Sequence, residues 1–316
     1  MKKEIGGYFE LETYNLPLLH ENALALNSGR ACLEYLISQR RIRRIALPYF
    51  VCDVVSDTCR KMGVAISFYH VGADFLPIDV EVDSDTYMYI VNFYGQLDKE
   101  QLLAFKAKYP RLIIDNAQAY FSEALEGVDT LYTCRKFFGV ADGGFLYTDA
   151  PKKYLFQDES HDRMGFVLGR FERPAGEFYS DSSKNNDLFS NLPAMAMSKL
   201  TKNLLRAIDY EQVKKARTEN YAVLHRELGA LNKLEVKSVE GAFAYPLFIE
   251  GGAELRKKLA EKKIFVPTLW PNVLNECADG SLEHEFAKNI LPLPCDQRYG
   301  EEEMLYISEV IRTCIS

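Results

Sequence analysis

Residues 112–119 read LIIDNAQA, and residues 133–144 read TCRKFFGVADGG. The first stretch is an apolar run that ends abruptly in a carboxylate and an amide, which indicates a buried strand with polar groups at its carboxyl end. The second stretch places one lysine, Lys136, among small, polar and aromatic residues shortly before a pair of glycines. Each stretch therefore sets a chemically distinctive side chain at the end of a short strand.

An acid at one strand end and a lysine before a glycine turn suit pyridoxal 5'-phosphate as a cofactor. This cofactor needs an amine to hold its aldehyde as a Schiff base, and an acid to keep its ring nitrogen protonated. We predict that Lys136 forms the Schiff base and then carries a proton as a general acid and base. We predict that Asp115 pairs with the ring nitrogen, since a nearby negative charge raises the pKa of that nitrogen. The alternatives are a solvated lysine and an aspartate that caps the next helix.

Strand and helix patterns alternate along the first half of the chain. Strand patterns cover 44–47, 65–69, 87–91, 112–114, 130–133 and 144–148, and helix patterns cover 31–37, 54–61 and 100–109. Strands separated by single helices imply right-handed crossovers and a mostly parallel sheet, which binds ligands beyond the carboxyl ends of its strands. Asn92, Asp115 and the segment 133–136 all follow such strand ends. We therefore expect them to meet in one crevice.

The rest of the chain predicts a second, smaller unit. The polar stretch 157–191 indicates a functional loop or a boundary, and a long helix is expected over about 193–228. Further strands are expected at 234–236, 244–249 and 290–294, and further helices over 253–262 and from 301 onward. We predict an α/β fold with a large domain over 1–190, followed over 191–316 by a linking helix and a small α+β domain.

Composition narrows the class of ligand. The 316 residues carry a formal net charge of −7, and 47% of them are hydrophobic. An acidic protein is a poor partner for nucleic acid or an anionic membrane, so we expect a small-molecule ligand. The sequence holds no signal peptide and no apolar run long enough to span a membrane, which predicts a cytoplasmic protein. Seven scattered cysteines and five unclustered histidines predict free thiols and no metal site.

Over most of its length the sequence resembles the DegT/StrS-type (DegT/DnrJ/EryC/StrS) sugar aminotransferases, a branch of the fold type I pyridoxal-phosphate enzymes. The matching segments are 27–31 NSGRA, 47–52 LPYFVC, 92–95 NFYG, 115–119 DNAQA, Lys136 with 142–144 DGG, 265–271 FVPTLWP and 291–294 LPLP. The resemblance implies an aspartate aminotransferase-like fold and pyridoxal phosphate as cofactor. It also implies a homodimer whose active sites are shared between the subunits.

The resemblance also implies which residues bind the cofactor. The phosphate would lie near Ser28, on the amides of Gly29 and Arg30 at the start of a helix, where free N–H groups and the helix dipole favour an anion. Gln118 would donate a hydrogen bond to the phenolic oxygen of the cofactor. Thr133 or Arg135 would add contacts to the phosphate.

Three positions depart from the family pattern or leave alternatives open. Arg30 stands where the family has Thr or Ser, so it either replaces the hydroxyl contact or binds an anionic group of the substrate. Cys52 falls on the position of the aromatic ring that stacks on the cofactor, and Phe50 is predicted to take that role, with a core position as the alternative. Asn185 is predicted to reach the cofactor phosphate of a partner subunit, and Asn186 competes with it for this role.

The function implied is transfer of an amino group from an amino acid to a keto-sugar carried on a nucleotide, and the family resemblance implies glutamate as the amino acid. Such enzymes supply amino sugars for polysaccharide biosynthesis. A sugar dehydratase on the same scaffold is the second reading, but those relatives carry histidine in place of the lysine. The third is a regulatory protein that binds pyridoxal phosphate or a sugar nucleotide without turnover. Arg30, Cys52 and the short chain favour that third reading.

Overall fold

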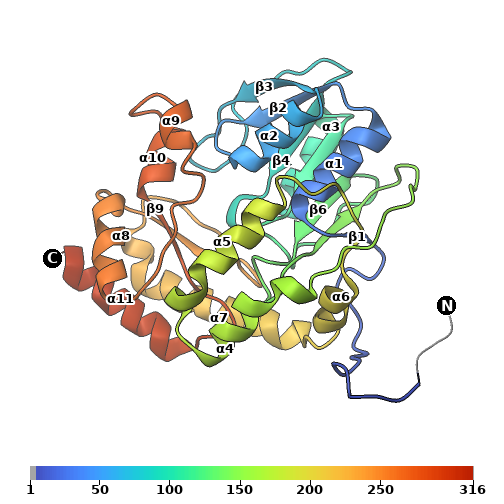
Figure 1. Cartoon of the computed structure of the whole chain (residues 1–316). Helices are drawn as coiled ribbons and strands as arrows, with labels where there is room; N and C mark the ends of the chain where they lie inside the picture. The colour runs from blue at the N-terminus through green and yellow to red at the C-terminus, as the bar shows by residue number, and fades with distance from the viewer. Residues whose placement is uncertain (1–4, 316) are drawn as a thin grey trace.

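A seven-stranded sheet forms the centre of the computed structural model, which describes residues 5–315 (Figure 1). Its strands are β1 (Leu24–Leu26), β2 (Arg44–Pro48), β3 (Ala65–Tyr69), β4 (Tyr87–Val91), β5 (Leu112–Asp115), β6 (Asp129–Thr133) and β7 (Gly144–Tyr147), in the order β1-β7-β6-β5-β4-β2-β3. Strands β3, β2, β4, β5 and β6 pair in parallel, and β7 runs antiparallel to both of its neighbours. The mostly parallel sheet confirms the predicted fold class.

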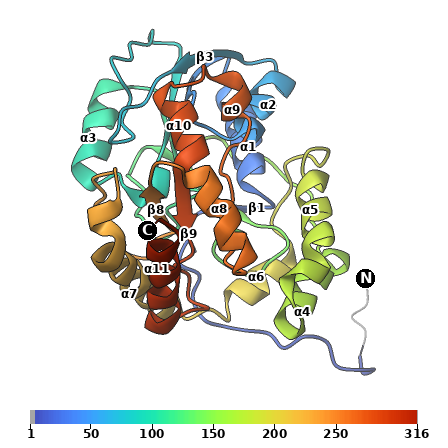
Figure 2. The same cartoon turned by 90° about the vertical axis from the view of Figure 1, so that its left-hand side faces the viewer.

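Three crossover helices cover the sheet. Helices α1 (Gly29–Arg40) and α2 (Asp53–Lys61) pack together, and α3 (Lys99–Lys108) lies on the opposite side of the sheet (Figure 2). Local sequence fixes where α1 and α3 begin. The Ser28 hydroxyl accepts a hydrogen bond from the Ala31 amide of α1 at 3.0 Å. Asp98 and Gln101 form a capping box at the start of α3. Such caps satisfy amides that have no partner within the helix.

The prediction of a loop over 157–191 is wrong in its central part. This stretch holds α4 (Gly165–Glu172) and α5 (Tyr179–Leu188), which lie across the middle of Figure 1 and along the right-hand edge of the molecule in Figure 2. The residues of α5 read YSDSSKNNDL and carry no apolar stripe. Helices of this kind depend on tertiary contacts rather than on their own periodicity, so the sequence pattern did not reveal them.

The single helix expected over 193–228 is two helices, α6 (Lys199–Leu205) and α7 (Tyr210–Leu228). The break has a local cause: the Asp209 side chain accepts a hydrogen bond from the Gln212 amide and starts a new helix. The strand expected at 234–236 is irregular chain in the structure.

The C-terminal part builds a second layer around a two-stranded antiparallel sheet, β8 (Tyr245–Phe248) and β9 (Ile290–Leu293). Helix α11 (Glu301–Ile315) packs on both α7 and α8 (Gly252–Glu261), and α9 (Val273–Glu276) packs on α10 (Leu282–Asn289). One apolar cluster includes side chains from both sides of position 190, among them Phe93, Trp270 and Phe286. The division at 190 stays a prediction. No helix within the described residues is long and apolar enough to cross a membrane.

Candidate active site

A cavity of about 250 Å³ lies at the carboxyl ends of β4, β5 and β6. Asp115, Thr133 and Lys136 line it together with the start of α1. Asn92, the third residue expected there, lies behind the wall: its amide nitrogen donates to Asn116 Oδ1 at 3.0 Å and its oxygen accepts from the Leu97 amide. The structure thus brings Asp115 and Lys136 into one cavity, with Asn92 as a support.

Asp115 is buried at the end of β5 and holds two hydrogen bonds. Tyr89 donates its hydroxyl to Oδ2 at 2.8 Å, and the Ala117 amide donates to Oδ1 at 2.8 Å. Burial raises the pKa of the Asp115 carboxyl, whereas the positive charge of Lys136 and these two bonds act against the rise. Tyr89, from the neighbouring strand, therefore fixes the direction in which the carboxylate faces the cavity.

Lys136 lies where the cavity meets a larger cleft of about 710 Å³ that runs toward α4 and residues 296–299. Its side chain is exposed, but the exposed surface faces these two hollows, and dehydration by the surrounding protein lowers the pKa of its amine. The charge of Asp115 acts in the opposite direction. Among residues 5–315 the amine has no hydrogen bond or ion pair, and its nitrogen lies 5.7 Å from the centre of the Phe243 ring.

Gln118 lines the same cavity and is almost fully buried. Its oxygen accepts a hydrogen bond from the Tyr94 amide at 2.9 Å, which orients the side-chain amide. The nitrogen, Nε2, is buried and has no partner in the described part of the chain. A buried donor without an acceptor is costly, and a ligand acceptor in the cavity would relieve that cost.

Two tight turns, at residues 27–29 and 142–144, meet at the other end of the cavity. The Gly143 amide donates to the Asn27 carbonyl at 2.7 Å, and Gly144 lies so close to Ser28 that an added Cβ would come within 2.7 Å of the Ser28 carbonyl atoms. Glycine is therefore required at position 144. This contact sets the start of α1, with Ser28 and Gly29, against the end of β6, where Thr133 lies.

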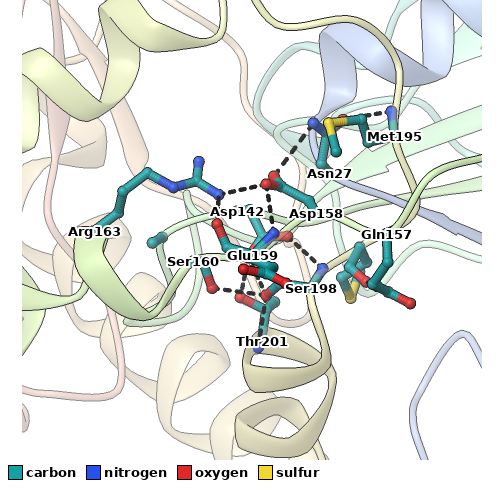
Figure 3. Close-up of polar contacts among 12 residues, drawn as sticks. Asn27, Asp142, Gln157, Asp158, Glu159, Ser160, Arg163, Met195, Ser198 and Thr201 are labelled. Atoms are coloured by element: carbon teal, nitrogen blue, oxygen red, sulfur yellow. Dashed lines mark hydrogen bonds and ion pairs between the residues drawn. The ribbon is translucent and has the colours of Figure 1, made fainter. Parts of the chain in front are cut away.

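A buried network of hydrogen bonds fixes the first residue of each turn, Asn27 and Asp142 (Figure 3). Asp142 accepts hydrogen bonds from the Ser198 amide at 2.8 Å, the Ser198 hydroxyl at 2.7 Å and the Thr201 hydroxyl. Asp158 accepts from Arg163 at 2.9 Å and from Asn27 at 3.3 Å. Both carboxylates are thus bonded within the network, which anchors the first residue of each turn.

Phe50 lies away from the cavity, contrary to the predicted role in stacking. Its ring is 1% exposed and packs edge-on against Trp270, at 4.5 Å between ring centres. The chain turns here, since the Val51 amide donates to the Tyr49 carbonyl at 3.0 Å, so the side chains do not alternate as they would in an extended strand. Cys52 and Trp270 line the cavity instead, and burial raises the pKa of the Cys52 thiol to about 11, which keeps it neutral.

The predicted role of Asn185 toward a partner subunit stays a prediction. Asn185 is buried on α5, and its amide nitrogen donates to the Ala141 carbonyl of the same chain at 2.8 Å. The competing residue, Asn186, lines the cavity of its own chain and accepts a hydrogen bond from Arg135 at 2.5 Å.

Arg30 and Arg135 bring positive charge to the turn end of the cavity. Burial and the nearby charge of Arg30 lower the pKa of Arg135 to about 10. Sequence reasoning missed the cavity residues Tyr89, Phe189 and Trp270, and it named Asn186 only as the alternative to Asn185. Of the missed residues, only Trp270 lay in a segment that the family resemblance had marked.

No family model matches the sequence, and no curated protein matches it. Solved structures do match over nearly the whole chain. Spr1654 of Streptococcus pneumoniae, described as a sugar aminotransferase in its PLP form, shares 15% identity with a TM-score of 0.64, covering 93% of this chain and 88% of that chain. The chain has the fold of the sugar aminotransferases.

Two further structures show the same fold. DesV of S. venezuelae, in complex with a ketimine intermediate, shares 18% identity with a TM-score of 0.65, covering 92% of this chain and 84% of that chain. The sugar aminotransferase CalS13 of Micromonospora echinospora shares 16% identity with a TM-score of 0.63, covering 93% of this chain and 88% of that chain. At these identities the likeness establishes the fold, and function has to be argued from the cavity.

Proposed function

We propose that the protein is a pyridoxal phosphate-dependent aminotransferase that moves an amino group from an amino acid, glutamate, to a nucleotide-linked keto-sugar. The observation that carries this proposal is the meeting of Asp115 and Lys136 in one cavity at the carboxyl edge of the sheet. The fold, which the sugar aminotransferases share, and the family motifs in the sequence support it. The homodimer, the cytoplasmic location and a role in polysaccharide biosynthesis rest on the sequence resemblance.

The residues of the cavity suit this cofactor. Arg30 and Arg135 offer positive charge to a phosphate, Gln118 Nε2 is a buried donor for a phenolic oxygen, and Asp115 is an acid for a ring nitrogen. Lys136 offers an amine with no competing hydrogen bond within residues 5–315. When bound, pyridoxal phosphate supplies an aldehyde that links to amines. Its ring would withdraw electrons from the substrate carbon that carries the linked amine nitrogen.

The roles of the protein groups follow from their environments. Dehydration lowers the pKa of Lys136, so a larger fraction of its amine is neutral and able to accept a proton near neutral pH. Asp115 holds negative charge at the cavity wall, where Tyr89 fixes its orientation. Lys136 faces the larger cleft as well, so the same amine can pass a proton to a substrate that enters from that side.

A visible absorption spectrum tests the proposal directly. The purified protein mixed with pyridoxal phosphate should show a visible band, which should bleach when glutamate is added. Lys136→Ala should abolish the band, and Lys152→Ala, an exposed lysine away from the cavity, should leave it unchanged. A band that forms but does not bleach with any amino acid would favour the regulatory reading. The absence of any band would refute both the aminotransferase and a regulatory role that depends on pyridoxal phosphate.

A further inference from the structure

Three side chains at the start of α10 bring their polar atoms together away from the cavity. Nδ1 of His284 lies 3.4 Å from Oδ1 of Asp279 and 3.7 Å from Oε1 of Glu285, and all three atoms lie within 4.8 Å of one another. Neither carboxylate has an ion pair with a lysine or an arginine among residues 5–315. None of the three residues lines the cavity or the larger cleft. The cluster therefore lies outside the site described above.

His284 supplies the observation that points to a ligand. The residue is 9% exposed, and its Nδ1 atom is buried and has no hydrogen-bond partner in the described part of the chain. An N–H···O hydrogen bond spans about 2.7–3.2 Å, so both carboxylate oxygens lie too far away to form one. A buried polar atom without a partner is costly. An ion held between the three atoms would remove that cost.

Local sequence explains how the two carboxylates come to face the imidazole. Gly280 has a φ of +82°, a left-handed conformation that glycine adopts without strain, and the Ser281 hydroxyl then caps α10. This turn brings Asp279 back to the start of the helix. On the helix itself, Oε2 of Glu285 accepts a hydrogen bond from Asn289 at 2.8 Å. Oε1 of the same carboxylate has no hydrogen bond within residues 5–315 and faces the imidazole.

The donor types and their spacing match a zinc ion. Zinc binds imidazole nitrogen and carboxylate oxygen at about 2.0–2.2 Å in a tetrahedral arrangement, which sets two ligand atoms about 3.4 Å apart. The distances of 3.4 Å and 3.7 Å from Nδ1 fit this arrangement, and the two carboxylates balance the charge of a divalent cation. The sequence predicts no metal site because its five histidines are scattered. A single histidine with two carboxylates does not show in that pattern.

We propose that Nδ1 of His284, Asp279 and Glu285 bind a zinc ion, with water as the fourth ligand. The ion ties the turn at 278–281 to α10. This helix also packs on the first part of the chain through Phe286, whose ring centre lies 5.4 Å from that of Phe50. Zinc therefore stabilises the C-terminal part of the chain. The site needs neither pyridoxal phosphate nor turnover, so it is independent of the proposed function.

Isothermal titration calorimetry tests the site on the full chain, freed of metal by a chelator and without pyridoxal phosphate. The wild-type chain should bind one zinc ion at this site. Loss of an outer partner of a metal ligand already costs about 10- to 100-fold in affinity, so His284→Gln should weaken binding by at least about 10-fold. His161→Gln is the matched control, because His161 is exposed and lies outside the cluster, and it should leave the affinity unchanged.

Asp279→Ala provides a second variant that does not disturb the core. Asp279 is exposed, so its replacement should keep the fold and still weaken zinc binding. Glu302→Ala removes the same charge from an exposed position on α11 and should leave zinc binding unchanged. Zinc should raise the midpoint of thermal unfolding in the wild-type chain and raise it less in Asp279→Ala.

Cobalt(II) in place of zinc shows whether a thiol is a ligand. Cys277 is free, partly exposed and close in sequence to the turn. Cobalt held by nitrogen and oxygen alone should give weak visible bands without the intense near-ultraviolet band of a cobalt–thiolate bond, and Cys277→Ser should leave zinc affinity unchanged. A thiolate band that Cys277→Ser removes would overturn the site. Zinc binding that His284→Gln and Asp279→Ala leave at full affinity would overturn it as well, as would a wild-type chain that binds no zinc, since a protonated imidazole paired with the two carboxylates would then account for the cluster.

Discussion

The charge on Lys136 depends on Asp115 more than on any other charged group in its surroundings. Dehydration lowers the pKa of the lysine, and the negative charge of Asp115 partly offsets this effect. Conversely, the charge of Lys136 opposes the effect of burial on Asp115. The two side chains thus set each other's protonation before any ligand arrives, which is how paired groups in active sites are commonly tuned.

Replacing Asp115 by asparagine should therefore shift the reactivity of Lys136 toward lower pH. Only the neutral amine attacks an aldehyde, so the rate rises as pH passes the pKa of the lysine. Asp115→Asn removes the charge that raises this pKa, so the midpoint of the rate profile should move to lower pH. Salicylaldehyde is a suitable probe, because it has an aldehyde and a hydroxyl group but no ring nitrogen for Asp115 to bind.

The control is Asp53→Asn, at the start of α2 near Cys52, since Asp53 does not contribute to the pKa shift of Lys136. It should leave the midpoint in place. A midpoint that stays put in Asp115→Asn, or that moves to higher pH, would contradict the coupling between the two residues.

At the scale of elements, the close approach of β7 to the start of α1 shapes the turn end of the cavity. A Cβ at position 144 would lie 2.7 Å from the Ser28 carbonyl atoms and 3.0 Å from the Gly29 amide nitrogen, all of them backbone atoms that cannot swing aside. Gly144→Ala should lower the free energy of unfolding by about 1–3 kcal/mol, the usual range for overpacking. Urea unfolding measures this loss.

Gly165→Ala serves as the comparison, because a Cβ at the first residue of α4 meets nothing within 4 Å. Alanine there should be neutral or slightly stabilising. Gly144→Ala should also weaken binding of pyridoxal phosphate, since the displaced turn carries Ser28 and Gly29. Equal stability of the two variants would show that β7 can move away from α1 without cost.

The sequence predicted the elements that depend on local interactions and missed those that depend on contacts between distant parts of the chain. The central strands and the helices α1, α2 and α3 were predicted because apolar patterns and caps are local, and the positions of Asp115 and Lys136 followed from the strand ends. The helix α5 was missed because its residues carry no apolar stripe. Phe50 was misassigned because one turn at Tyr49–Val51 redirects its side chain, and the pattern of the segment does not show it.

At the scale of the whole molecule, the two parts of the chain share an apolar core. Trp270 and Phe286 from the C-terminal part pack against Phe50 and Phe93 from the first part. Trp270 also forms a wall of the cavity. Ligand binding and the packing between the two parts therefore involve the same side chain, even though the sequence predicts a boundary at 190.

This shared core predicts that the chain unfolds in one thermal transition that pyridoxal phosphate shifts as a whole. A ligand at 100 times its dissociation constant stabilises the folded state by about 2.7 kcal/mol. Scanning calorimetry should show a single peak that moves to higher temperature with pyridoxal phosphate. The peak should move less with pyridoxal, because pyridoxal lacks the phosphate that Arg30 and Arg135 would bind. Lys136→Ala should reduce the shift, because the link to the aldehyde is lost. Two separate peaks, of which only one responds to the ligand, would contradict this prediction. They would show that the C-terminal part unfolds as an independent domain and that the contacts of Trp270 do not couple it to the first part of the chain.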